Sequence, residues 1–142
     1  LYNVLTKLNI SNNDSIIDIG SGKGFALTIM NLFPFKKILG VEITSNDFNI
    51  SNKNFEILNI TNIQTQNIDI NNFNDYSNFN YYYFYNPFSE IIFENIIKNI
   101  NSNSYVIYKN IHEAEKTILS KYNFKLFFDE KGFERNYYIY KN

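Results

Sequence analysis

The stretch from Ile16 to Gly24 constrains the fold of this chain more than any other part of the sequence. It begins with a nearly continuous apolar run interrupted by Asp18, which is typical of a parallel strand that is buried on both faces. Glycines at alternate positions then allow the backbone to turn tightly and to approach a ligand closely. A helix expected over 25–33 would point its first N–H groups at that ligand. The stretch therefore predicts a strand, a glycine turn and a helix that together bind a small molecule.

The spacing of the glycines bears on the class of ligand. A dinucleotide-binding turn has the pattern Gly-x-Gly-x-x-Gly, with a pyrophosphate at the helix N-terminus. This chain has Gly20-x-Gly22-x-Gly24, and Asp18 lies two residues upstream. A carboxylate at that position would repel an anion and attract an ammonium group. The spacing favours a ligand with an ammonium group, although a short glycine motif can also be a plain turn of any α/β protein.

A second carboxylate follows at the end of the next apolar run. The residues from Lys37 to Ile43 form an expected buried strand that reaches Glu42. This residue lies ~20 residues beyond the glycines, the interval at which nucleotide-binding α/β units place a carboxylate on ribose hydroxyls. Glu42 alone could be a solvated strand end. Together with Asp18 and the glycines, it is much harder to explain by chance.

The pattern Asp-x-Gly-x-Gly-x-Gly resembles motif I of the class I S-adenosylmethionine-dependent methyltransferases, and Gly40-Val41-Glu42 resembles their second motif. The resemblance implies that S-adenosylmethionine is the cofactor and that Glu42 binds its ribose hydroxyls. It also implies a loop around the amino-acid end of the cofactor, organised by Asp18. That loop comprises Asp18, Gly20, Ser21, Gly22 and Gly24.

A third expected strand, Ile63–Ile68, ends at Asp69. The resemblance implies that the Asp69 carboxylate accepts a hydrogen bond from the adenine amino group. It further implies that Ile43 and Ile68, or Ile70, cover the faces of the adenine ring. The local alternative is that Asp69 begins a loop as an Asx-turn residue. Residues 71–80, which follow, are expected to form a surface connection.

Five successive aromatic residues, Tyr81–Tyr85, predict a fourth strand, which Asn86 and Pro87 would end. Asn86-Pro87-Phe88 resembles the Asn/Asp-Pro-Pro-aromatic motif of the amino-methylating branch of the family, with one proline missing and Phe88 one residue early. The resemblance implies that Asn86, beside the transferable methyl group, accepts a hydrogen bond from the target nitrogen and that Phe88 stacks on a planar substrate. Alternatively, Asn-Pro begins a turn and Ser89 caps the next helix.

The rest of the chain completes an α/β pattern. We expect helices over 44–58, 89–100 and 112–121, a fifth strand over 105–108, and a final antiparallel pair over 124–128 and 137–140. These elements predict a single domain over 1–142 with the three-layer α/β/α sandwich of the family. Its mostly parallel seven-stranded sheet would end in a C-terminal antiparallel hairpin. Residues 1–12 are expected to be the tail of a lead-in helix.

Composition limits the alternatives. The absence of cysteine excludes a disulfide framework and a cysteine nucleophile, and a single histidine gives no ligand cluster, so no metal site is expected. His112 could act as a base but is more readily a structural residue at a helix start. A net charge of −1, from 13 basic and 14 acidic residues, provides no basic stripe for nucleic acid. Without an apolar run of ~18 residues or a signal peptide, we expect a cytoplasmic protein with no membrane contact.

The sequence therefore predicts an S-adenosylmethionine-dependent methyltransferase that modifies a nitrogen of a protein or small molecule in preference to RNA or DNA. The alternative is a non-catalytic or RNA/DNA-directed subunit of the same fold that binds the cofactor and acts with a partner. A nicotinamide-dependent oxidoreductase would need the other glycine spacing. Because the chain begins with Leu1, a missing N-terminal segment or a partner subunit could supply acceptor recognition.

Overall fold

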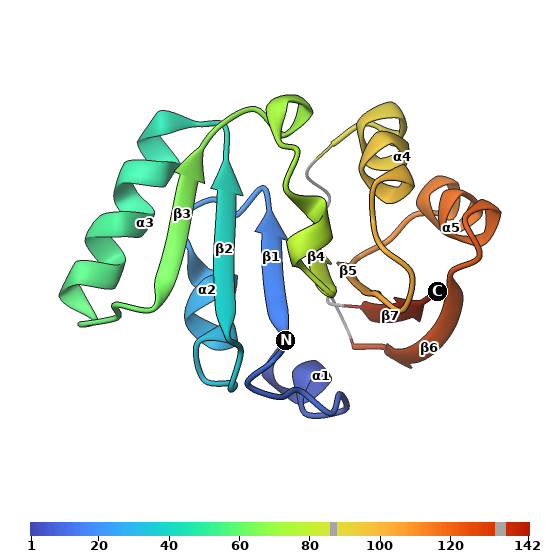
Figure 1. The fold of residues 1–142 in the computed structure, drawn as a ribbon, viewed down its shortest axis with the longest axis horizontal. Helices are drawn as coiled ribbons and strands as arrows, with labels where there is room; N and C mark the ends of the chain where they lie inside the picture. The colour runs from blue at the N-terminus through green and yellow to red at the C-terminus, as the bar shows by residue number, and fades with distance from the viewer. Residues whose placement is uncertain (86–87, 133–135) are drawn as a thin grey trace. The chain divides into compact units, whose positions relative to one another are not determined.

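A computed structural model describes residues 1–85, 88–132 and 136–142 (Figure 1). The chain divides into two compact units, Leu1–Asn74 and Asp75–Asn142. The strand order of its seven-stranded sheet is β3-β2-β1-β4-β5-β7-β6. The predicted α/β class is confirmed, as are the mostly parallel sheet and its C-terminal antiparallel pair.

The first unit contains three parallel strands whose arrowheads point the same way in Figure 1. Strands β1 and β2 are buried on both faces, as their apolar runs predict. Because the strands are parallel, their carboxyl ends meet at one edge of the sheet. In chain order the elements are α1 (Tyr2–Leu5), β1 (Ser15–Ile19), α2 (Phe25–Met30), β2 (Lys37–Glu42), α3 (Ser45–Ile57), β3 (Ile63–Asn67) and the short 3-10 turn η1 (Ile70–Asn72).

Helix α2 is shorter than the sequence predicts. It ends at Met30, and the chain then tightens through hydrogen bonds between residues three apart, such as Phe33 N to Met30 O at 3.0 Å. The residue before a proline is disfavoured in helical geometry, so Phe33 cannot continue the helix into Pro34. Leu32, beyond the end of the helix, is 68% exposed. Only one face of this short helix packs against the strands.

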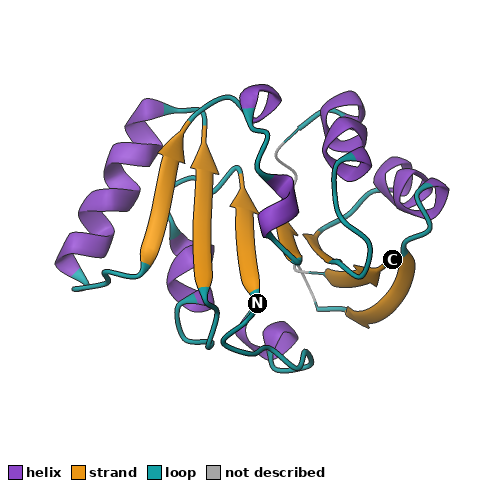
Figure 2. Ribbon diagram, in the orientation of Figure 1, coloured by secondary structure: helices purple, strands orange, loops and turns teal. Residues whose placement is uncertain are grey.

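The second unit contains the remaining strands. Strands β4 and β5 are parallel, whereas β7 pairs antiparallel with β5 and with β6. Figure 2 shows the short 3-10 turns between β3 and β4. In chain order the elements are η2 (Tyr76–Asn78), β4 (Tyr81–Phe84), α4 (Glu90–Lys98), β5 (Tyr105–Lys109), α5 (Glu113–Lys121), β6 (Lys125–Glu130) and β7 (Tyr137–Lys141).

Aromatic rings form much of the core of the second unit. The Phe84 ring lies 5.1 Å from the Phe93 ring and 5.7 Å from the Tyr108 ring, measured between centroids. Edge-to-face and stacked arrangements at these separations are favourable. The expectation that residues 71–80 form a surface connection is wrong in one respect. This segment carries three buried rings, Phe73, Tyr76 and Phe79, because its 3-10 turns fold them inward.

Replacing Tyr82 with phenylalanine is expected to reduce the free energy of unfolding by about 1–3 kcal/mol. The buried Tyr82 hydroxyl lies 2.6 Å from the carbonyl oxygen of Tyr76 and 2.9 Å from that of Phe79. Loss of the hydroxyl would remove one hydrogen-bond donor from each of these two carbonyl oxygens inside the unit. Urea unfolding followed by circular dichroism measures the change. Tyr85→Phe is the control at a half-exposed position, and equal stability of the two variants would contradict this role of Tyr82.

Candidate functional site

The glycine turn begins where the β1–β2 ladder ends. The N–H groups of Gly20 and Ser21 both donate to the carbonyl oxygen of Val41, at 2.9 and 3.0 Å. The φ angles of Gly20, Gly22 and Gly24 are 81°, 52° and 83°, all in the left-handed region. Residues with a Cβ adopt this region at a cost, so the alternating glycines make the turn possible.

Two of these glycines have different surroundings. A Cβ placed on Gly24 would lie 2.5 Å from Cζ of Phe55 and 3.1 Å from Cβ of Ser51, both on α3. At Gly22 a Cβ would meet nothing within 4 Å. Gly24 therefore permits close packing between the start of α2 and α3, whereas Gly22 faces open space that a ligand can approach.

Glu42 joins the glycine turn to the turn after β2. Its carboxylate accepts a hydrogen bond from Gly22 N at one oxygen and from Thr44 N at the other, each at 2.8 Å. A carboxylate has about four acceptor positions, so each oxygen can accept a further hydrogen bond from a ligand hydroxyl. The expected ribose contact stays a prediction. The link to Gly22 was not foreseen, because no sequence pattern marks a backbone partner 20 positions away.

Asp18 is buried inside β1, opposite Gly40 of β2, and is only 2% exposed. Burial, followed by the negative charge of Glu42, raises the pKa of the Asp18 carboxyl to about 8. The carboxyl is therefore mostly protonated at neutral pH when no ligand is bound. The attraction predicted from the sequence needs a charged carboxylate at Asp18. Its predicted attraction for an ammonium group thus requires the proton to leave as the ligand binds.

The residues assigned to the adenine ring lie at the carboxyl ends of β2 and β3. Ile43 is 61% exposed and Ile68 is half-buried, whereas Ile70 is buried. Of the two alternatives for the second ring face, Ile68 is the more accessible. Oδ1 of Asp69 accepts hydrogen bonds from the backbone and side-chain nitrogens of Asn71, at 2.9 and 3.0 Å. The Asx turn is therefore present, and the adenine contact of Asp69 stays a prediction.

Of the three residues proposed for the acceptor, Phe88 is among the described residues. Asn86 and Pro87 lie outside the described residues, and Phe88 is half-buried. Ser89 occupies the N-cap position of α4 without a capping hydrogen bond from its side chain. His112 lies at the start of α5, where its backbone N–H donates to the Glu115 carboxylate at 3.2 Å. That contact supports the structural interpretation of His112.

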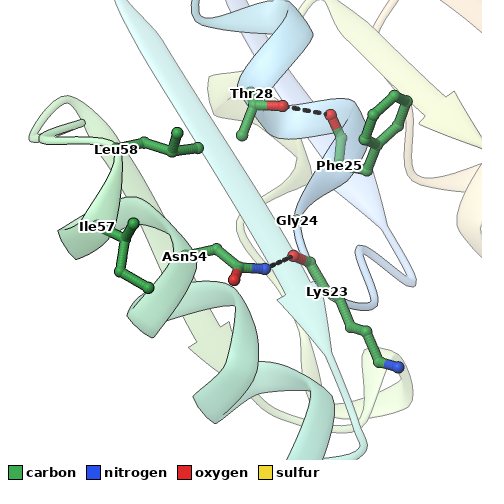
Figure 3. Close-up of a pocket in the computed structure, with 7 residues that line it drawn as sticks. All are labelled: Lys23, Gly24, Phe25, Thr28, Asn54, Ile57 and Leu58. Atoms are coloured by element: carbon green, nitrogen blue, oxygen red, sulfur yellow. Dashed lines mark hydrogen bonds between the residues drawn. The ribbon is translucent and has the colours of Figure 1, made fainter.

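A pocket of about 520 Å³ lies between α2 and the second half of α3 (Figure 3). The Asn54 side chain donates to the carbonyl oxygen of Lys23 at 3.1 Å, and the Lys23 side chain extends away from Ile57 and Leu58 in this view. The pocket includes Gly24 of the glycine turn but none of the other predicted cofactor residues. Its lining consists of Lys23, Gly24, Phe25, Thr28, Asn54, Ile57 and Leu58.

The described ranges contain neither a metal-binding cluster nor a membrane-spanning helix. Within them, no group of three or more His, Cys, Asp or Glu residues is arranged to hold a metal ion. None of the helices in the same ranges has the length and apolar character needed to cross a membrane.

Comparisons with solved structures identify the same fold in methyltransferases that act on different molecules. A ribosomal protein L11 methylase from Lactobacillus delbrueckii subsp. bulgaricus is 14% identical, with a TM-score of 0.78 over 99% of this chain and 76% of that one. A precorrin-6y C5,15-methyltransferase from Geobacter metallireducens GS-15 is also 14% identical, with a TM-score of 0.77 over 99% and 87%. An RNA methyltransferase from Salinibacter ruber, in complex with S-adenosylhomocysteine, is 12% identical, with a TM-score of 0.75 over 96% and 86%.

Comparison of sequences gives the family directly. No curated protein sequence matches the chain. A family model described as a methyltransferase domain matches residues 10–134, which include the glycine turn and all strands from β1 to β6. The chain thus belongs to the methyltransferase domain family and has the class I, Rossmann-like fold of the S-adenosylmethionine-dependent methyltransferases.

Proposed function

We propose that the chain is an S-adenosylmethionine-dependent methyltransferase that modifies a nitrogen of a protein or small-molecule acceptor. One observation carries the cofactor assignment. The Glu42 carboxylate holds the glycine turn through Gly22 N at 2.8 Å and retains acceptor positions for hydroxyl groups, and the space in front of Gly22 is open. This arrangement suits a ligand whose ribose lies at Glu42 and whose remaining atoms extend past the glycine turn.

The proposed contacts follow the carboxyl ends of β1, β2 and β3. Asp18 and the residues Gly20, Ser21, Gly22 and Gly24 would hold the amino-acid end of the cofactor. Glu42 would accept hydrogen bonds from the ribose hydroxyls. Ile43 and Ile68 would cover the adenine faces, and Asp69 would accept from the adenine amino group. The S-adenosylhomocysteine in the Salinibacter ruber neighbour supports this class of ligand.

When bound, S-adenosylmethionine supplies a methyl group on a positively charged sulfur that is already activated for transfer. The protein's part is then to orient the reactants and exclude water. In the first unit the Glu42 carboxylate fits this task, because the residue is only 8% exposed and accepts hydrogen bonds from two backbone amides. A fixed turn keeps the ligand in one orientation.

The choice of a nitrogen acceptor rests on Asn86-Pro87-Phe88. Three neighbours of similar fold are described as acting on a ribosomal protein, a precorrin and RNA, so the fold leaves the acceptor class open. We assign Asn86 to the target nitrogen and Phe88 to the planar part of the substrate. A protein or small molecule is favoured because the net charge of −1 offers little attraction to phosphates.

Asn86→Ala is expected to lower the rate of methyl transfer by roughly 10²-fold while leaving the affinity for S-adenosylhomocysteine unchanged, because it removes orientation of the acceptor. Transfer of a labelled methyl group from S-adenosylmethionine into fractionated cell extract identifies the acceptor fraction and measures the rate. Calorimetric titration measures the affinity. Asn95→Ala, at an exposed position on α4, is the matched control and should retain full activity.

The outcomes separate the possible functions. Full activity of Asn86→Ala would reject the assignment of Asn86. Binding of S-adenosylhomocysteine without methyl transfer into any fraction would favour the cofactor-binding subunit that acts with a partner. Failure of the wild-type protein to bind S-adenosylhomocysteine would reject the proposed function itself.

A further inference from the structure

Asn67, the last residue of β3, fastens the turn between β2 and α3. Its side-chain nitrogen donates to the carbonyl oxygens of Glu42 at 2.8 Å and Ile43 at 3.0 Å. Its side-chain oxygen accepts a hydrogen bond from the Ser45 hydroxyl at 2.7 Å. Both N–H groups and the oxygen of one amide therefore bind three of the four residues from Glu42 to Ser45.

These contacts begin where the strand pairing stops. The β2–β3 ladder ends at the pair Glu42 and Asn67, so Ile43 lies beyond the last paired position. The remaining member of the turn, Thr44, is held by a different group, because its N–H donates to the Glu42 carboxylate at 2.8 Å. The turn is thus fixed by two groups, the Asn67 amide and the Glu42 carboxylate.

We propose that Asn67 is a positioning residue for the adenosine half of the cofactor. This inference rests on the proposed function, in which Glu42 binds the ribose and Ile43 covers the adenine. Asn67 acts through the backbone of these two residues and not by touching the ligand. It keeps the Glu42 carboxylate and the exposed Ile43 side chain at a fixed separation.

The structure indicates that loss of Asn67 would affect the turn more than the strand. The backbone N–H of Ile68 also donates to the Glu42 carbonyl, at 3.1 Å, so β3 stays attached to β2 without the side chain. The Ile43 carbonyl, by contrast, is held by the Asn67 amide beyond the ladder. The effect on ligand binding should therefore exceed the effect on stability.

Asn52 provides a matched control on the same pair of elements. Its side-chain nitrogen donates to the Phe48 carbonyl oxygen at 3.1 Å, and its oxygen accepts from the Thr65 hydroxyl at 2.7 Å. The Asn52 amide thus connects α3 with β3, just as the Asn67 amide connects β3 with the turn before α3. Asn52 lies within the helix, however, and both partners of its amide, Phe48 and Thr65, lie outside the turn from Glu42 to Ser45. Asn52→Asp thus changes the same chemistry away from the proposed site.

The test measures the binding of two ligands by calorimetry to the wild-type chain and to Asn67→Asp, Asn67→Ala and Asn52→Asp. S-adenosylhomocysteine has both halves of the cofactor product, whereas 5′-methylthioadenosine lacks the amino-acid end. We expect both Asn67 variants to bind each ligand at least ~10-fold more weakly, by a similar factor for the two ligands. Asn52→Asp should bind both like the wild type, and thermal melting should show comparable stability losses for Asn67→Asp and Asn52→Asp.

Several results would overturn the proposal. Wild-type affinity in Asn67→Ala, which introduces no charge, would show that the amide is not needed. An equal loss in Asn52→Asp would reduce Asn67 to a general structural role. A loss confined to S-adenosylhomocysteine would place the effect at the amino-acid end. If the wild-type chain binds neither ligand, the proposed function fails, and Asn67 then has no cofactor to position.

Discussion

Gly24→Ala is expected to destabilise the protein by roughly 3–5 kcal/mol, because it combines a steric clash with backbone strain. The new Cβ would lie 2.5 Å from Cζ of Phe55 and 3.1 Å from Cβ of Ser51. Both residues are buried on α3, so the Phe55 ring cannot move aside without disturbing its own packing. The φ angle of 83° adds strain whatever space is made. Urea unfolding followed by circular dichroism measures the free energy.

Gly22→Ala is the control for this prediction, since it has the strain without the clash. Its φ angle is 52° and its Cβ would meet nothing within 4 Å, so a loss of only about 1 kcal/mol is expected. Similar losses in the two variants would show that contact between the turn and α3 contributes little. A larger loss in Gly22→Ala would reverse the roles given to the two glycines.

Asp18→Asn is expected to stabilise the ligand-free protein increasingly as the pH rises from about 4 to about 8. Burial and Glu42 raise the pKa of the Asp18 carboxyl from 3.8 to about 8. Between these values the unfolded chain has released the proton while the folded protein retains it, so wild-type stability falls with rising pH. The slope from this one group is about 1.4 kcal/mol per pH unit. Asparagine does not ionise, so the variant lacks this contribution.

The measurement is the difference in free energy of unfolding between Asp18→Asn and the wild type at several pH values. Taking the difference removes the contributions of other titrating groups. It should be independent of pH below about 4 and should grow through the window up to about 8. A difference that does not change with pH across this window would mean that Asp18 ionises normally in the folded protein.

The sequence was sufficient for the fold because its strongest signals are local. The nearly continuous apolar runs around Ile17 and Leu39 predict buried parallel strands. In the structure Ile17 lies in β1 and is paired with Leu39 in β2. The glycine turn follows from residues that tolerate positive φ angles. The helix expected over 25–33 is shorter in the structure, because α2 ends at Met30 and the residue before Pro34 is disfavoured in helical geometry.

The candidate site could be predicted only where a residue type marks its own role. Asp18 and Glu42 stand out because carboxylates end or interrupt apolar strands. The hydrogen bonds from Gly22 to Glu42 and from Asn67 to Ile43 join residues that are 20 and 24 positions apart in the sequence. No local pattern therefore predicts them. Asparagine is also so common in this chain that Asn67 carries no signal by itself. Its role becomes visible only when the turn it binds is seen in three dimensions.

The attachment of Gly22 to Glu42 has a consequence for the kinetics of ligand capture. A loop that must be ordered by its ligand loses conformational entropy during binding, which weakens affinity and slows productive association. Here the loop is restrained by a hydrogen bond made within the chain, from Gly22 N to the Glu42 carboxylate at 2.8 Å. Most of that entropy is therefore lost when the chain folds, and an arriving ligand meets a loop whose shape is already set.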